Sequence, residues 1–241
     1  MYEEVKFLIA GDRALVVEFG DKIEKQVNSK IRSLTMAMER EDIVGIIETI
    51  PTYRSLMVIY EPMIIELENL ILTIKSIISK MHELRLAEAK VIEIPTLYGG
   101  GDGPDIEFVA EHNNISVDEV IRIHTDMKYL IYMIGFTPGF PYLGGMSDKI
   151  QAPRLQNPRT KIPIGSVGIA GKQTGIYPVE SPGGWQLIGR TPVKLYDPSR
   201  EHPVLLKAGD YIKFVSIDEN EYKNIEALEN EGKYKVIIRE K

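Results

Sequence analysis

Cysteine is absent from the 241-residue sequence. Its absence excludes disulfide bonds, zinc-thiolate sites and cysteine nucleophiles together. Histidine is scarce, and the few histidines are scattered without the spacing of metal ligands. They are His82, His112, His124 and His202. We therefore expect no bound metal ion in this chain.

Long apolar runs and an excess of basic residues are also missing. No run approaches the roughly 20 apolar residues of a membrane span. The net charge of -6 does not provide the basic footprint that a nucleic-acid-binding protein needs. Segment 1–13 carries acidic residues where a signal peptide needs basic ones. The sequence thus predicts a cytoplasmic protein that binds neither membranes nor nucleic acids.

Glycine and proline are rare in the first part of the chain and frequent in the second. Three glycines precede Pro95, whereas fifteen lie between Gly99 and Gly189 inclusive. Regular helices and strands hold few glycines, while turn-rich β domains need many. This change in composition predicts two domains, 1–95 and 96–241.

The first domain has the pattern of a small α+β unit. Strands are predicted at 5–11, 14–19, 43–51, 55–61 and 90–96. Apolar residues at spacings of three and four predict two helices, at 23–38 and 67–84. Asp21 and Glu24 have the spacing of a capping box for the first helix. This order of elements predicts a ferredoxin-like sheet, closed by the strand at 90–96, with both helices on one face.

The second domain has the pattern of a β domain that begins with a glycine-rich loop. Loop 98–104 lacks the Gly-Lys-Ser/Thr ending of a P-loop, and Asp102 and Asp105 would repel phosphate. We expect a tight turn with Asp105 as the cap of the next helix, and Ser116 with Glu119 as a second capping box. The short apolar runs that follow, separated by Gly and Pro, predict a barrel or a sandwich.

Four segments differ from ordinary β-domain sequence. They are 135–143, 153–163, 165–178 and 181–192. Pro-Gly pairs at Pro138 and Pro182 predict type II turns, which would present Phe140, Tyr142 and Trp185 from rigid loops. Aromatic rings beside polar groups suit a small-molecule pocket or a subunit interface. The alternative is that these rings plug the end of the barrel.

The same segments hold the one concentrated basic stretch of this acidic sequence. Arg154, Arg159 and Lys161 lie in the second segment, and Arg190 lies in the fourth. Guanidinium groups match carboxylates and phosphates in geometry, which suits an anionic substrate or a nucleotide. The alternative is a set of surface ion pairs. Neutral candidates for orienting a substrate, each of which also suits a turn or edge-strand hydrogen bond, are Ser166, Gln173, Thr174 and Tyr177.

Acid-base machinery is missing from the four segments. None of them contains a histidine, and no Ser-His-Asp arrangement, Cys-His arrangement or close carboxylate pair is recognisable. A general base must come from a carboxylate elsewhere or from another chain. The sequence therefore predicts half of an active site and leaves the general base unassigned.

The motifs together resemble those of a known family. They are YGGGDGPD at 98–105, GFTPGFPYL at 135–143, GSVGIAGKQTGIYP at 165–178 and SPGGWQLIGRTP at 181–192. They are similar to the family whose members are known as the B-type subunit of 5-oxoprolinase, kinase A inhibitor (KipI) or allophanate hydrolase subunit 1. The resemblance extends over essentially the whole chain, including GDRALVVEFGD at 11–21.

The resemblance implies a cyclophilin-like β-barrel for domain 96–241. It also implies a complex with A-type and C-type subunits that opens 5-oxo-L-proline to L-glutamate, with ATP and Mg²⁺ as co-substrate, and a chain that is inactive alone. Phosphorylating a lactam oxygen needs stabilisation of spread negative charge, for which we expect Arg154, Arg159 and Lys161 as catalytic cations. The expected substrate-binding residues are Phe140, Tyr142, Ser166, Gln173, Thr174, Tyr177, Trp185 and Arg190.

Other branches of the family imply two alternative activities. One is inhibition of a sensor histidine kinase, which would then be the partner. The other is a carboxyltransferase-type module of a urea-carboxylase-like system, which would depend on a biotin carrier. The sequence leaves open which subunit of the complex holds ATP, and whether this chain by itself binds nucleotide.

Overall fold

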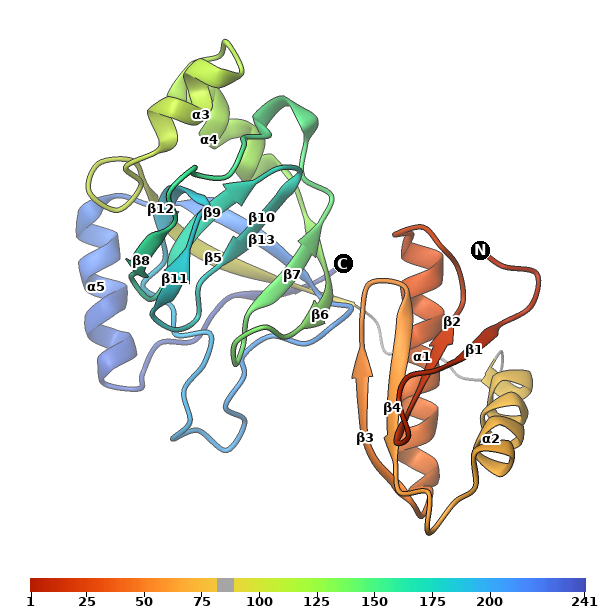
Figure 1. The fold of residues 1–241 in the computed structure, drawn as a ribbon. Coiled ribbons are helices and arrows are strands. Elements are labelled where there is room, and N and C mark those ends of the chain that lie inside the picture. Colours follow the sequence, from red (N-terminus) through yellow and green to blue (C-terminus); the bar gives the residue numbers. More distant parts are fainter. Residues whose placement is uncertain (82–88) are drawn as a thin grey trace. The chain divides into compact units, whose positions relative to one another are not determined.

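The computed structural model describes residues 1–81 and 89–241. The chain divides into two compact units, Met1–Ala87 and Glu88–Lys241 (Figure 1). His82 and the end of the predicted helix 67–84 lie outside the described residues. None of the described helices has the length and apolar character that crossing a bilayer requires.

A four-stranded antiparallel sheet and two helices form the first unit. Its elements are β1 (Lys6–Ile9), β2 (Ala14–Glu18), α1 (Lys25–Glu41), β3 (Ile46–Pro51), β4 (Ser55–Tyr60) and α2 (Leu67–Lys80). The strand order β1-β2-β4-β3 is that of a ferredoxin-like sheet. The edge strand beside β2 comes from the start of the unit instead of its end.

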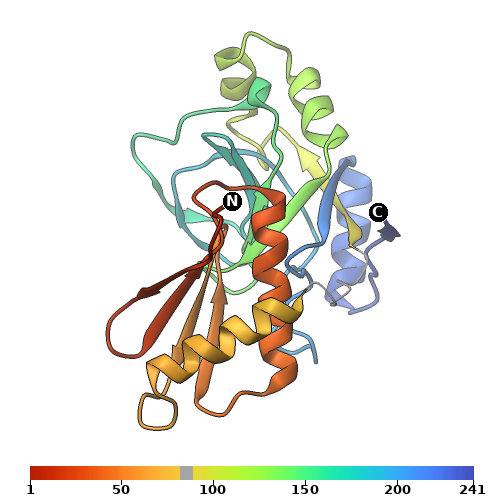
Figure 2. The same ribbon diagram turned by 90° about the vertical axis from the view of Figure 1, so that its right-hand side faces the viewer.

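Both helices cover the same face of this sheet, as Figure 2 shows. The register pairs Val17 with Leu56 and Leu15 with Val58. These four side chains are fully buried and share one core with the apolar stripes of α1 and α2. The predicted helical periodicity is confirmed, because a stripe that recurs every three to four residues meets every second residue of each strand.

The start of α1 differs from the prediction. Glu24 occupies the N-cap position, and no side chain caps the helix there. The expected capping box of Asp21 and Glu24 is wrong, because the helix begins at Lys25 and Asp21 therefore precedes its N-cap.

The second unit is built around a seven-stranded barrel. Its elements are β5 (Lys90–Tyr98), α3 (Ile106–His112), α4 (Val117–Asp126), β6 (Tyr129–Ile134), β7 (Pro141–Gly144), η2 (Asp148–Ile150), β8 (Arg159–Ile162), β9 (Ser166–Ala170), β10 (Gln173–Ile176), β11 (Ser181–Gly183), β12 (Gln186–Arg190), β13 (Tyr211–Ser216), α5 (Glu219–Asn230) and β14 (Ile238–Glu240). The sheet runs β10-β9-β12-β5-β13-β6-β7, and β10 also contacts β7, so the barrel is nearly closed. The fold is the expected cyclophilin-like β-barrel following a ferredoxin-like unit.

The strand β5 belongs to this barrel, and the prediction that it closes the first unit is wrong. It pairs in parallel with β13 and antiparallel with β12 and β14. Val91, Ile92 and Ile94 are all buried, as is typical of a central strand that is covered on both faces. The place beside β2 in the first sheet is held by β1. The boundary between the units therefore precedes β5.

The two helices after β5 begin differently. Ser116 caps α4 as predicted, because its hydroxyl accepts a hydrogen bond from the Glu119 backbone N–H at 3.2 Å. Asp105 occupies the N-cap position of α3, but its side chain makes no cap hydrogen bond. The expected capping role of Asp105 is wrong, since its two carboxylate oxygens accept hydrogen bonds from Arg159 and Leu187 instead.

Candidate functional site

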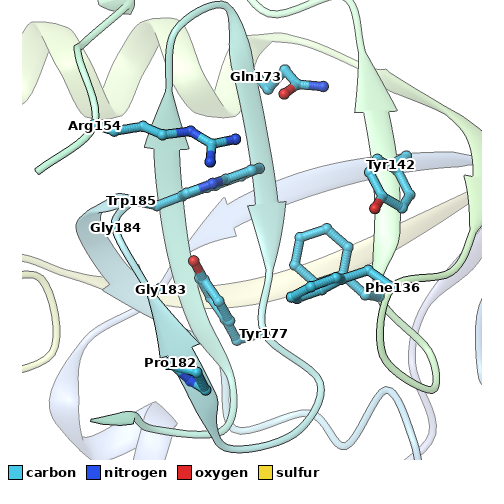
Figure 3. Close-up of a pocket in the computed structure, with 10 residues that line it drawn as sticks. Phe136, Tyr142, Arg154, Gln173, Tyr177, Pro182, Gly183, Gly184 and Trp185 are labelled. Carbon is cyan, nitrogen blue, oxygen red and sulfur yellow. The ribbon is translucent and has the colours of Figure 1, made fainter. Parts of the chain in front are cut away.

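A cavity of about 170 Å³ lies beside β7, β10 and β11 on the barrel (Figure 3). Its lining combines aromatic rings, one guanidinium group, one amide and a short Pro-Gly-Gly stretch. The lining residues are Phe136, Phe140, Tyr142, Arg154, Gln173, Tyr177, Pro182, Gly183, Gly184 and Trp185. They come from all four segments that the sequence analysis separated from the rest of the domain. Those segments, distant in sequence, therefore converge on one site.

Phe140 is the centre of the aromatic part of this site. Its ring meets those of Tyr142, Tyr177 and Trp185 edge to face, at centroid distances of 5.4, 5.8 and 5.9 Å. Phe140 and Tyr177 are buried, and with Ile162 and Leu187 they form a small core of their own. Edge-to-face contacts stabilise such clusters beyond the area that they bury. The rings therefore form a cluster that is separate from the main core of the barrel, and they line the cavity, so the alternative that they plug the end of the barrel does not describe them.

Two Pro-Gly pairs shape the walls in different ways. Gly139 has a φ of 80°, the positive value expected for the predicted type II turn. Pro182 and Gly183 instead form strand β11, which pairs with β8, so the second predicted turn is wrong. The reason is lateral pairing: Gly183 lies opposite Arg159, and a Cβ atom at Gly183 would lie 2.5 Å from the Tyr177 hydroxyl.

Phe136 also lines the cavity, although its sequence context does not by itself mark it as a site residue. The residue is 71% exposed, and its φ of 66° is in the left-handed region that aromatic residues rarely adopt. The Phe136 ring meets Phe140 edge to face at 5.7 Å. The neighbouring Thr-Pro-Gly turn was the available signal, because a turn there leaves the residue before it at the cavity rim.

Arg154 brings positive charge to the cavity. Its side chain lies next to Trp185, with Gln173 further along the same wall (Figure 3). Within the described residues Arg154 forms no ion pair, in contrast to Arg159, Lys161 and Arg190. An exposed guanidinium that has no acidic partner and lies beside the aromatic rings of the cavity is suited to bind a carboxylate ligand.

Tyr177 contributes a neutral hydroxyl to the site. Burial raises the pKa of its phenol to about 12, although the nearby charges of Arg154 and Arg159 act in the opposite direction. The phenol therefore stays protonated at neutral pH and can donate a hydrogen bond as well as accept one.

The other three predicted cations are not among the residues that line the cavity. Arg159 is ion-paired with Asp105 at 2.8 Å, and Lys161 is paired with Glu180 at 2.9 Å on the exposed edge of β8. Arg190 donates from Nε to the Ile164 carbonyl and lines a separate cavity of about 150 Å³. The surface ion-pair alternative thus describes Lys161, and the expected convergence of four cations on one cleft does not occur.

Ser166 and Thr174 are also outside the lining, because both are buried within β9 and β10. The Thr174 hydroxyl lies 2.9 Å from His124 Nε2 and donates to the Gly168 carbonyl at 3.0 Å. Alternation explains this position: Gln173 and Thr174 are neighbours on one strand, so their side chains point to opposite faces.

The site can bind and orient a molecule, but it lacks a proton acceptor of the usual kinds. Among the described residues that line the cavity there is no aspartate, glutamate or histidine. In the part of the chain that the structure describes, no group of three or more such residues is placed to hold a metal ion. The groups that the lining does offer, a guanidinium, an amide, a phenol and aromatic rings, suit a small, partly apolar anion.

Comparisons with known proteins agree with this architecture. The family model described as carboxyltransferase domain, subdomain C and D, matches residues 5–206. The B-type subunit of the 5-oxoprolinase of Bacillus subtilis (strain 168) is 47% identical over 222 residues, which cover 88% of this chain and 92% of that protein. The chain therefore belongs to the carboxyltransferase subdomain C and D family and, within it, to the family of 5-oxoprolinase B-type subunits.

Solved structures add to this comparison. A conserved uncharacterized protein from Pyrococcus horikoshii is 48% identical, and its crystal structure superposes with a TM-score of 0.54 over 90% of this chain and 100% of its own. The urea carboxylase of Kluyveromyces lactis gives a TM-score of 0.78 over 98% of this chain at 24% identity. This chain spans 24% of that urea carboxylase, whose likeness shows a shared fold.

Proposed function

We propose that this chain is the B-type subunit of a cytoplasmic, ATP-dependent 5-oxoprolinase, which opens 5-oxo-L-proline to L-glutamate together with A-type and C-type subunits. The names of its close relatives support this proposal, since the Bacillus subtilis and Escherichia coli O157:H7 proteins, at 47% and 38% identity, are both 5-oxoprolinase B-type subunits. The chain matches nearly the full length of each.

The observation that carries the proposal is the composition of the cavity. In our proposal Arg154 binds the substrate carboxylate, the Phe136, Phe140 and Trp185 rings contact the apolar ring carbons, and the Gln173 amide orients the lactam group. In this proposal the cavity of about 170 Å³ receives a single small ring.

The nucleotide, in this proposal, is held by a partner chain. A lactam amide is unreactive at neutral pH, and transferring a phosphoryl group from ATP to its oxygen makes the carbonyl carbon open to attack by water. Mg-ATP needs several convergent cations and carboxylates, whereas the described lining residues offer one guanidinium and no carboxylate. These residues do not fit the triphosphate, so we propose that partners supply the nucleotide site and the general base, and that this chain is inactive alone.

The test of Arg154 uses two ligands that differ in their carboxylate. Arg154→Gln is expected to raise the Kd for 5-oxo-L-proline at least about tenfold, since hydrogen bonds to charged groups contribute about 1.5–3 kcal/mol. Binding of 2-pyrrolidinone, which lacks the carboxylate, should not change. Fluorescence of Trp185, the chain's single tryptophan, reports binding of both.

The matched control is Lys172→Gln. Lys172 adjoins Gln173 in sequence but is exposed and ion-paired with Asp148 at 3.0 Å. The Lys172→Gln variant should leave the Kd values for 5-oxo-L-proline and 2-pyrrolidinone unchanged. The assignment of Arg154 is overturned by an Arg154→Gln variant that binds 5-oxo-L-proline as tightly as the unaltered chain does.

A second candidate is a carboxyltransferase-type module, which is favoured by the match to the carboxyltransferase subdomain C and D model and by the urea carboxylase fold. Such a module would bind a small amide beside carboxybiotin. Its activity would require a biotin carrier protein, while the 5-oxoprolinase would require A-type and C-type subunits with ATP. Assaying the purified chain with each set of partners separates the two, and co-purification with a sensor histidine kinase would favour the inhibitor alternative instead.

A further inference from the structure

The glycine-rich loop 99–105 lies directly against strand β12. The Gly99 backbone N–H donates to the Ile188 carbonyl at 3.1 Å, and that of Asp105 donates to the Leu187 carbonyl at 2.9 Å. A Cβ atom at Gly103 would lie 2.2 Å from the Ile188 carbonyl oxygen, which real structures do not allow. Position 103 therefore requires glycine because the loop packs backbone against backbone there, and this packing brings the Asp105 side chain to β12.

Both carboxylate oxygens of Asp105 have partners there. One accepts a hydrogen bond from the Leu187 backbone N–H at 2.6 Å, and the other accepts from Arg159 Nη2 at 2.8 Å. The Asp105 side chain is 14% exposed and that of Arg159 is 29% exposed. Since both partners are donors, the position requires an acceptor at each oxygen, which a carboxylate provides.

Arg159 extends the chain of contacts to the cavity wall. Its Nη1 donates to the Trp185 carbonyl at 3.3 Å. Nearby, the Leu155 backbone N–H donates to the Gly184 carbonyl at 2.7 Å, and Gln186 Nε2 donates to the Pro153 carbonyl at 2.9 Å. These bonds tie the segment that carries Arg154 to the segment that carries Trp185.

We infer that Asp105 is a positioning residue of the cavity: through Arg159 it holds the Trp185 wall and the neighbouring Arg154 at the spacing that receives an anionic ligand. Neither Asp105 nor Arg159 lines the cavity. If the cavity wall is already held in place before binding, the ligand does not lose affinity by having to order it. The affinity therefore depends on this support. The identity of the ligand rests on the proposed function, while the support of Trp185 does not.

The test replaces Asp105 with asparagine, which has nearly the same shape. One atom of the amide would be an NH₂ group facing a donor, either Leu187 N–H or Arg159, so one of the two hydrogen bonds must be lost. Asp102→Asn is the matched control, because Asp102 lies in the same loop but is paired with Arg190 at 3.5 Å, away from the cavity. Two readouts use Trp185: acrylamide quenching without ligand, and the fluorescence titration with 5-oxo-L-proline.

The Asp105→Asn variant is expected to show increased acrylamide quenching of Trp185 at temperatures well below the unfolding temperature of the variant. It is also expected to raise the Kd for 5-oxo-L-proline about tenfold. Asp102→Asn should match the unaltered chain in both. Arg159→Lys provides a second variant, because it keeps a cation beside Asp105 but loses the fork that also reaches the Trp185 carbonyl. It should increase quenching as well.

The inference is overturned if Asp105→Asn, or Arg159→Lys where Asp105→Asn does not fold, shows the quenching and Kd of the unaltered chain. A loss of stability without any change in quenching of the folded protein also overturns it, since that is the result of a purely structural role. If the unaltered chain and its reconstituted complex do not respond to 5-oxo-L-proline, the proposed function fails, and the quenching comparison still decides the role of Asp105.

Discussion

Inside the barrel, His124 is fully buried and connects three elements through its ring. The Tyr98 hydroxyl lies 2.7 Å from His124 Nδ1, and Thr174 Oγ1 lies 2.9 Å from Nε2. Since the Thr174 hydroxyl donates to the Gly168 carbonyl, it accepts from His124 Nε2–H, and Tyr98 donates to Nδ1. Each ring nitrogen then has a partner, and the histidine is held in its neutral form.

This arrangement predicts a loss of stability in mild acid. Burial lowers the pKa of His124 to about 3, from an ordinary value of 6.5. Below pH 6.5 the unfolded chain binds a proton that the folded protein does not take up until about pH 3, so stability falls as the pH drops through that window. At about 1.4 kcal/mol per pH unit, this residue removes roughly 2 kcal/mol between pH 6.5 and pH 5, which urea unfolding measures.

His124→Gln is the variant that isolates this contribution. Glutamine keeps a donor and an acceptor but does not titrate, so the free energy of unfolding should fall less steeply between pH 7 and pH 5. The exposed His202 provides the control, since His202→Gln should keep the slope of the unaltered chain. Equal slopes for His124→Gln and the unaltered chain would contradict the assignment.

The adjacent glycines Gly183 and Gly184 give a second prediction at the scale of single residues. A methyl group at Gly183 would lie 2.5 Å from the Tyr177 hydroxyl and 2.8 Å from Ile162 Cδ1, whereas at Gly184 its nearest neighbour would be Pro158 at 3.6 Å. Gly183→Ala should therefore displace Tyr177, destabilise the barrel by about 1–3 kcal/mol and weaken ligand binding. Gly184→Ala should keep the unfolding temperature of the unaltered chain, because its methyl group meets no close neighbour. Thermal unfolding and the Trp185 titration measure both, and identical behaviour of the two variants would rule out the steric argument.

At the scale of elements, β5 decides how the chain divides. It pairs with β12, β13 and β14, and Ile94 on it is fully buried in the barrel core. A fragment of residues 89–241 should therefore fold with its cavity formed, while a fragment of residues 96–241 should not, because it lacks most of a central strand. Circular dichroism and Trp185 fluorescence distinguish the two, and a folded 96–241 fragment would refute the assignment of β5.

The sequence predicts which segments form helices and strands better than it predicts which strands pair with one another. The strands β1 to β4, both helices of the first unit and the Ser116 cap follow from local pattern, because spacing and capping depend on residues a few positions apart. The partner of β5 does not, since its apolar run suits any central position in a sheet. Asp105 is a second case that local sequence does not predict. A carboxylate before a helix usually caps it, but here its two oxygens accept hydrogen bonds from Arg159 and from the Leu187 N–H instead.

At the scale of the whole molecule, we propose that the cavity binds the substrate and that partner subunits complete the chemistry. The purified chain is therefore expected to bind 5-oxo-L-proline with a change in Trp185 fluorescence, yet to release no glutamate with Mg-ATP. Glutamate should form when A-type and C-type subunits are added, because in our proposal they supply the nucleotide site and the base. Turnover by the chain alone, measured as glutamate against time, would refute the division of labour.

The sequence by itself determined the classes of element, the two-part organisation, the family, and the four segments that meet at the cavity, since each depends on local pattern or on long motifs. Only the tertiary structure decided which residues of those segments share the site. Gln173 lines the cavity and Thr174 does not, because neighbours on a strand point to opposite faces. Arg154 remains available to a ligand while Arg159 is paired, because the backbone path of loop 99–105 brings Asp105 to one arginine and not to the other.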